Sequence, residues 1–290
     1  LEVRIVPMLE WLDAMCHPDG EISFFNDAAL GVTPPVTEIK DYWVRLCLLL
    51  SDTEKFTGLT DLPHSGYSRV EMGDAVALID RAAVGPDYMP GHAHAETLSF
   101  ELSLFGQRVV VNSGTSVYGT GNQRHLERGT AAHSTVVIDA ENSSEVWGGF
   151  RVARRARIID RKQNEIDGVV HLAACHVGYT RLTGKPVHCR EWLFEGGALS
   201  IHDKVTGRGV HEAKSVLPLH PDIKVLNIIE NLAVLDVLGH EVVVTLEGAG
   251  VLEATKSFYH PEFGVAVENT KLIFSTKERL PIDITTRVSW

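Results

Sequence analysis

The feature that most constrains the fold is a long series of short β-branched and aromatic runs after about residue 56, separated by Gly, Asn, Asp and Pro. Runs of this kind are typical of strands. They predict strands at residues 76–79, 99–104, 108–111, 134–138, 169–174, 192–194, 233–237, 242–246, 264–267 and 272–275. So many short strands favour an antiparallel β-sandwich or barrel, and a chain of 290 residues with 44% hydrophobic content is long enough for one large all-β unit with an appendage.

The first 50 residues follow a different pattern. Apolar residues recur every three to four positions over residues 3–16 and again over residues 39–50, which predicts two amphipathic helices. Glycines and prolines between them, such as Pro18, Gly20 and Pro34, prevent one continuous helix. Because two short helices bury too little surface to form a core of their own, we expect residues 1–55 to be the truncated end of a helical domain and residues 56–290 to be the β domain.

Charge and composition exclude several classes of protein. No run approaches the roughly 18 apolar residues of a membrane span. A net charge of −11 argues against a nucleic-acid partner. Between residues 124 and 161, however, seven arginines outnumber five carboxylates, which suits either a salt-bridged strand face or an anionic substrate. The four cysteines form no C-x-x-C pair, so neither a zinc knuckle nor a dense disulfide framework is predicted, and the compartment stays open.

The candidate chemistry lies between residues 91 and 151. In Gly-His-Ala-His-Ala-Glu, alternate residues of an extended segment place His92, His94 and Glu96 on one face, as in a metal or proton-transfer site. An H-x-H pair is a weak signal alone, so a further ligand must come from elsewhere. His133, at the entry of a strongly β-branched run, is the candidate, and Asn112 ends a buried-looking strand between the two segments.

Four ordered blocks resemble the heparinase II/III family of polysaccharide lyases. They are Gly-His-x-His-Ala-Glu, Val-Asn-Ser-Gly-Thr, Arg-Gly-Thr-Ala-Ala-His-Ser-Thr-Val-Val-Ile-Asp and Ser-Glu-Val-Trp-Gly-Gly-Phe-Arg. The resemblance implies a mainly β fold, a large antiparallel β-sandwich or supersandwich, preceded by a short helical remnant of an α/α toroid. It also implies cleavage of uronate-containing acidic polysaccharide by β-elimination, in a cleft between the two domains. A periplasmic or secreted location is favoured, with a cytoplasmic one still open.

The resemblance also assigns site residues. His92 is similar in position to the catalytic histidine of the sandwich, and His94, Asn112 and His133 fall where the family binds zinc. The middle ligand of the family is aspartate, so Asn112 is a departure. An amide oxygen is a poorer zinc ligand than a carboxylate, and we therefore expect weak zinc binding, completed by water or by Glu96.

The reaction itself demands further groups. Removing the proton next to a uronate carboxylate requires that the carboxylate charge be neutralised, while a base takes the proton and an acid protonates the leaving oxygen. His92 suits one of these roles, and Arg124 or Arg128 suits a bidentate clamp. The alternative for both arginines is pairing with Glu101, Glu127 or Asp139.

A second group of side chains is a candidate for substrate binding. Glu96, Trp147 and Arg151 lie in the matched blocks, and an indole face suits the apolar face of a sugar ring. The alternative for Trp147 is packing beside the Gly-Gly turn. The resemblance places a catalytic tyrosine in the toroid, which this chain lacks, so we expect the isolated segment to be inactive.

Two rival functions remain open. One is a non-catalytic carbohydrate-binding β-sandwich, and the other is a cupin-like metal protein, which H-x-H with a distant histidine also serves. The third and fourth matched blocks favour the lyase.

Overall fold

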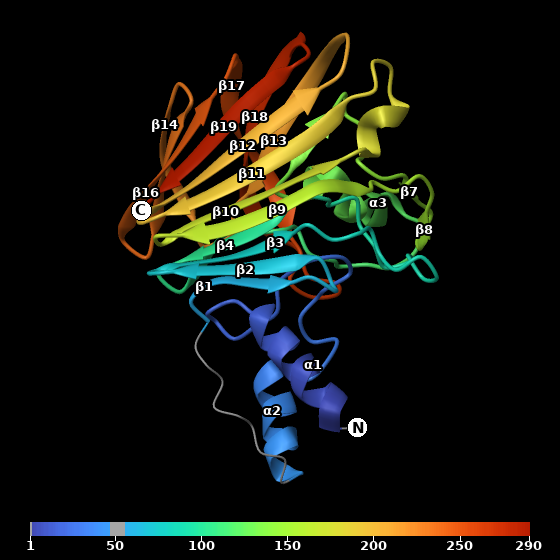
Figure 1. Cartoon of the computed structure of the whole chain (residues 1–290), viewed down its shortest axis with the longest axis vertical. Helices are drawn as coiled ribbons and strands as arrows, with labels where there is room; N and C mark the ends of the chain where they lie inside the picture. Colours follow the sequence, from blue (N-terminus) through green and yellow to red (C-terminus); the bar gives the residue numbers. More distant parts are fainter. Residues whose placement is uncertain (1, 47–55) are drawn as a thin grey trace.

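The computed structural model describes residues 2–46 and 56–290, and within these residues the strands form four antiparallel sheets (Figure 1). The sheet next to the helices has five strands in sequential order. They are β1 (Gly58–Leu62), β2 (Tyr67–Met72), β3 (Ala75–Asp80), β4 (Phe100–Leu104) and β5 (Gln107–Val110). Every residue of β3 and β4 is buried, including the polar side chains of Asp80, Glu101 and Ser103.

The largest sheet has eight strands in the order β14-β15-β16-β19-β12-β11-β10-β9. These are β9 (Ile158–Ile166), β10 (Val169–His176), β11 (Val187–Glu195), β12 (Ala198–Thr206), β14 (Lys224–Ile229), β15 (Leu232–Val237), β16 (His240–Glu247) and β19 (Ile282–Ser289). Burial alternates along β11, β15 and β19, so one face of this sheet covers the core and the other meets solvent.

The third sheet has four strands in the order β17-β18-β13-β6, and a two-stranded hairpin lies apart from it. The four strands are β6 (Val136–Ile138), β13 (Val210–Pro218), β17 (Gly250–Tyr259) and β18 (Val267–Arg279). The hairpin consists of β7 (Val146–Trp147) and β8 (Arg151–Val152). One continuous core joins the three larger sheets, with Phe100, Trp192 and Phe274 all buried in it. The mainly β sandwich predicted from the sequence is therefore confirmed.

Helices are few in the described residues. α1 (Glu2–Ala14) and α2 (Val36–Arg45) project below β1 and β2 in Figure 1, and Lys40 bridges to Asp13 between them at 2.6 Å. A third helix, α3 (Asn122–Arg128), lies beside β7. Two 3-10 turns are η1 (Thr130–Ala132) and η2 (Gly178–Arg181). No helix of residues 2–46 or 56–290 is long and apolar enough to cross a membrane.

Both predicted N-terminal helices are present, but α1 begins one residue before its predicted range of 3–16 and α2 begins at Val36, three residues before its predicted range of 39–50. The end predicted at residue 50 is outside the described residues. Residues 17–27, predicted only as a linker, pack on the sandwich. The backbone N–H of Phe24 donates to Glu101 on β4 at 3.0 Å, and that of Asn26 donates to Glu96 at 2.7 Å. His17 is buried and contacts the same Glu101 at 2.8 Å. This segment forms a wall of the region that carries the histidines.

Candidate active site and metal centre

The histidine-rich segment is a loop that precedes β4, and His94 holds its central position. The His92 side chain is 59% exposed, whereas that of His94 is fully buried. His94 shares one partner, Asp27, with His92. On its other side its ring lies 5.3 Å from that of His133, measured between centroids.

Asp27 connects the two histidines to an arginine. Its Oδ2 accepts from His92 Nδ1 at 2.9 Å and its Oδ1 accepts from His94 Nε2 at 2.7 Å. Arg124 donates to both carboxylate oxygens, with Nη2 2.7 Å from Oδ2. Burial alone raises the pKa of Asp27, but the hydrogen bonds from His94 and Arg124 outweigh it and hold the pKa well below its ordinary value of 3.8. Asp27 is therefore an ionised, acceptor-only group.

A second cluster contains His94, Glu96 and His133. One potential ligand atom from each residue lies within 4.8 Å of the others, and all three residues are buried. Glu96 Oε2 is 3.5 Å from His133 Nδ1. Burial and the neighbouring charges of His94 and Lys271 hold the pKa of His133 well below 6.5, so its ring is neutral, the form that binds metals.

Unpaired atoms in this cluster test whether it suits a metal. Four buried atoms have no hydrogen-bond partner among the described residues: His94 Nδ1, Glu96 Oε2, and both ring nitrogens of His133. Buried polar atoms are almost always paired, and each unpaired one costs about 1–3 kcal/mol. Two imidazoles and a carboxylate are also a common zinc donor set. The residues present therefore fit a divalent cation.

Asn112 lies in the irregular segment that follows β5 and hydrogen-bonds to the residue after His133. Its Oδ1 accepts from the backbone N–H of Ser134 at 3.3 Å, and its Nδ2 is buried without a partner among the described residues. Two residues on, Gly114 has φ +77°, and an added Cβ would lie 2.1 Å from the carbonyl oxygen of His260. Only glycine fits there, so the Asn-Ser-Gly-Thr segment has a steric reason for its glycine.

The geometry does not support Arg124 and Arg128 as a substrate clamp. Both side chains are buried. Arg124 is engaged by Asp27 and the carbonyl of Gly149, and Arg128 donates to backbone carbonyls that include Ala93 at 2.9 Å and Gly149 at 3.0 Å. For Arg124 the paired alternative is closer to the structure, but the partner is Asp27 rather than Glu101, Glu127 or Asp139. Among the described residues Arg128 pairs with no carboxylate and donates only to backbone carbonyls.

Glu96 needs a similar correction. It was predicted to contact substrate, but it is 3% exposed, and its Oε1 accepts the N–H of Asn26. A carboxylate so enclosed cannot reach a polymer in solvent. Its place in the cluster with His94 and His133 instead makes it a candidate metal ligand.

The exposed side of the site is aromatic. His92 has its ring centroid 5.7 Å from that of Phe150 and 6.1 Å from that of Tyr118. Trp147, on β7, is 57% exposed and is therefore not core packing. Arg151 lies opposite Trp147 across the hairpin, with its guanidinium 6.0 Å from the indole centroid. Trp147 and Arg151 thus remain available to a ligand.

The family comparison concerns the β domain as a whole. The sequence model described as "Heparinase II/III-like, C-terminal" matches residues 55–290. The chain belongs to this family. Comparison with curated protein sequences gave no match.

Solved structures show that the heparinase II/III-like fold extends over nearly the whole chain. The heparan sulfate lyase HepC from Pedobacter heparinus superposes with a TM-score of 0.79 at 16% identity, covering 97% of this chain and 46% of that one. A structure titled "Heparinase III-BT4657 gene product" gives 0.78 at 17% identity, covering 97% and 45%. This chain therefore spans less than half the length of these two structures.

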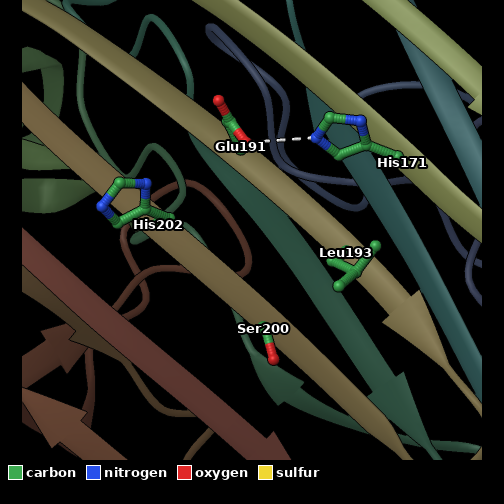
Figure 2. A pocket seen from close by; sticks show the side chains of 5 residues that line it. All are labelled: His171, Glu191, Leu193, Ser200 and His202. Atoms are coloured by element: carbon green, nitrogen blue, oxygen red, sulfur yellow. Dashed lines mark hydrogen bonds and ion pairs between the residues drawn. The ribbon is translucent and has the colours of Figure 1, made fainter.

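A shallow pocket of about 350 Å³ lies elsewhere, on the solvent face of the eight-stranded sheet (Figure 2). Its lining residues are His171, Glu191, Leu193, Ser200 and His202. His171 pairs with Glu191 at 3.2 Å, and His202 pairs with Asp283 at 3.1 Å. Both histidine rings are partly exposed and already paired. The pocket therefore lacks the unpaired buried atoms that mark the cluster of His94, Glu96 and His133.

Sequence reasoning missed Asp27 and Tyr118. Asp27 is 65 residues from His92 in the chain and follows no helix or strand periodicity. Tyr118 follows the Asn-Ser-Gly-Thr block by three residues, so its place beside a matched motif was the available signal.

Proposed function

We propose that this chain is the sandwich part of a polysaccharide lyase that cleaves uronate-containing acidic polysaccharide by β-elimination. Membership of the heparinase II/III-like family supports a lyase context. The matching structures are under 20% identical and exceed this chain in length, so they support the fold, and the activity is our inference from the site.

The observation that carries the proposal is the orientation of His92. Its Nδ1 contacts an ionised carboxylate while more than half of the side chain is exposed to solvent. Within the described residues, Nε2 has no hydrogen-bond partner. Proton transfer requires an imidazole with one nitrogen held by a hydrogen bond and the other accessible to the substrate, and His92 meets both conditions.

In the proposed reaction His92 transfers a proton at the uronate ring. The proton on C5 leaves to a base, its electron pair forms the C4–C5 double bond, the C4–O4 bond breaks, and O4 takes up a proton. Neutralising the carboxylate on C5 lowers the barrier most, because negative charge develops there. Arg151 is the exposed cation of the hairpin next to His92, so we assign it to this carboxylate, with Trp147 stacking on a sugar ring.

The proposed active site is divided between two domains. Arg124 and Arg128 are committed to internal partners, so neither is free to neutralise a substrate carboxylate. The helices expose apolar side chains that suit a packing partner: Met8, Trp11, Tyr42, Val44 and Leu46. We propose that an N-terminal toroid covers them and completes the cleft, and that the isolated segment is inactive.

We further propose that zinc binds to His94, Glu96 and His133, with Asn112 as a weak neighbour or ligand. The four unpaired atoms of these residues support this site. Zinc held by these residues would supply a structural cross-link, because His94, Glu96 and His133 are buried whereas the ring of His92 is exposed. The protein residues carry the proton transfers.

The two rival functions make different demands on this site. Exposed Trp147, Tyr118 and Phe150 suit a carbohydrate-binding module that releases no product. The donor set of two histidines and a carboxylate also suits a cupin-like iron protein, but ligands that are 1–3% exposed leave little access for oxygen and a co-substrate.

For compartment, we propose an oxidising one, periplasmic or extracellular. A disulfide joins Cys175 on β10 to Cys189 on β11, and such bonds persist mainly outside the cytoplasm.

The test is ultraviolet detection of unsaturated uronate ends from a panel of acidic polysaccharides. It compares this segment, the full-length protein and full-length His92→Ala. We expect product from the full-length protein only. Robust product from the isolated segment contradicts the divided site, an active His92→Ala enzyme contradicts the role of His92, and binding without product supports the carbohydrate-binding alternative.

A further inference from the structure

We propose that Asp27 is a positioning residue that fixes the ring tautomers of both His92 and His94, and so orients one ring for proton transfer and the other toward the candidate metal cluster. This inference rests on the proposed function for its catalytic consequence. Its structural content rests only on the contacts of Asp27, which lies in the segment between α1 and α2.

Asp27 sets the tautomer of His92 through its Oδ2 oxygen. An ionised carboxylate only accepts hydrogen bonds, so His92 Nδ1, 2.9 Å from Asp27 Oδ2, must carry the ring proton. The lone pair of the neutral ring then lies on Nε2, the nitrogen that has no partner among the described residues. Asp27 thereby sets which nitrogen accepts a proton, and it also holds the ring against the edge of Phe150.

Asp27 also sets the tautomer of His94, through its Oδ1 oxygen. The other oxygen of the same carboxylate accepts from His94 Nε2 at 2.7 Å, so the lone pair of this ring lies on Nδ1. Nδ1 is one of the buried unpaired atoms, and His94 belongs to the cluster with Glu96 and His133. A carboxylate that binds the far nitrogen of a ligating histidine is a recurrent means of orienting metal ligands. Asp27 therefore presents opposite nitrogens of two neighbouring histidines to two different tasks.

Arg124 balances the negative charge of Asp27. The Asp27 side chain is 4% exposed, and a carboxylate so enclosed requires a counter-ion. Arg124 donates to both of its oxygens and is itself held by the carbonyl of Gly149. The guanidinium also lies 5.1 Å from the ring centroid of Tyr118 and 5.4 Å from that of Phe150. Arg124 thus acts through Asp27 and not on the substrate.

Asp27→Asn is the informative variant, because it keeps the shape of the side chain but replaces one acceptor oxygen by a donor. We expect full-length Asp27→Asn to lose kcat by at least about 100-fold with KM within about threefold, since the ring is present in the wrong tautomer. The matched control is Asp19→Asn. Asp19 lies in the same segment and pairs with Arg108 at 2.7 Å, but it contacts neither histidine. Its kcat is expected to be unchanged.

A second measurement does not need activity. Ring nitrogen-15 spectra of histidine-labelled full-length protein, recorded at about pH 8 where histidine is ordinarily neutral, report the tautomer directly. We expect the proton of His92 on Nδ1 and that of His94 on Nε2, with the His92 signal altered in Asp27→Asn and unchanged in Asp19→Asn. His92→Gln identifies the signal.

The two measurements separate the inference from the proposed function. Wild-type His92 in the Nε2–H tautomer overturns the inference whether or not the protein is a lyase. An active full-length enzyme whose kcat is unaffected by Asp27→Asn also overturns it, while leaving the lyase proposal intact. A full-length protein without lyase product refutes the proposed function, and the tautomer spectra still decide the role of Asp27.

Discussion

Arg190 and Asp203 form a two-point ion pair inside the sandwich, with Nε 2.7 Å from Oδ1 and Nη2 2.8 Å from Oδ2. The remaining nitrogen, Nη1, donates to the carbonyls of Leu98 at 2.8 Å and Ser134 at 2.6 Å. Leu98 lies two residues after Glu96 in the chain, and Ser134 is the residue directly after His133. The pair thus fastens the backbone on both sides of the candidate metal centre to β11 and β12.

Arg190→Met should destabilise the protein strongly. It leaves Asp203 buried without its cation, and breaking one partner of such a pair costs about 3–5 kcal/mol. The free energy of unfolding, measured with denaturant, should recover much of this loss in Arg190→Met with Asp203→Leu. The comparison variant is Lys256→Met, whose pair with Glu268 is exposed and should change stability by less than about 1 kcal/mol. Equal effects of Arg190→Met and Lys256→Met would count against a structural role for the buried pair.

Stability should fall in mild acid because of His176. Burial, and then repulsion by His188 and Arg190, hold the pKa of His176 well below its ordinary 6.5. Above pH 6.5 the ring is neutral in both states. Below it the unfolded chain takes up a proton that the folded chain does not, so unfolding is favoured by up to about 1.4 kcal/mol per pH unit.

His176→Gln removes that proton uptake and should make the loss of stability below pH 6.5 shallower. Denaturant unfolding across a pH series measures the slope. His64→Gln, at an exposed turn between β1 and β2, is the control and should leave the slope unchanged. A slope that is equally steep in wild type and His176→Gln would show that other groups carry the acid sensitivity.

Zinc retention after dialysis should depend on the buried cluster. His94→Ala with His133→Ala should abolish stoichiometric zinc, and Glu96→Gln should weaken binding by at least about tenfold because the only carboxylate of the cluster is lost. Asn112→Asp should tighten binding, since a carboxylate is a better ligand than an amide.

The control for these metal variants is Glu262→Gln, an exposed carboxylate in the loop between β17 and β18. It should retain zinc as wild type does. Stoichiometric zinc in the His94 and His133 double variant would remove the assignment. A normal affinity in Glu96→Gln together with a tighter Asn112→Asp would transfer the third ligand position to Asn112.

Sequence reasoning found the strands that have a strong local signal and missed those that have none. The runs at 76–79 and 99–104 are buried on both faces, and both are strands, β3 and β4. β9 was missed because seven of its nine residues are exposed and polar side chains dominate it. The prediction at 264–267 was wrong except at its end, because residues 264–266 belong to the loop that precedes β18. Apolar content in the sequence predicts buried strands. An edge strand such as β9 can be mostly exposed, so it carries few apolar residues.

The candidate site shows the same limit for side chains. The histidines were found because matched blocks surround them, but the partner of Arg124 is 97 residues away in the chain. Nearby carboxylates such as Glu127 were reasonable expectations, since charge pairing is commonly local. Only the packing of residues 17–27 on β4 brings Asp27 to the arginine, and no short-range pattern encodes that contact.

That packing bears on where this protein can be cut. A chain trimmed to the stretch that the family shares, from residue 55 onward, would keep every described strand. It would nevertheless lose the N–H groups that occupy oxygens of Glu96 and Glu101, and with them Asp27. A fragment that preserves the contacts of His92 and His94 with Asp27 must therefore begin well before residue 55, where the match to the family begins.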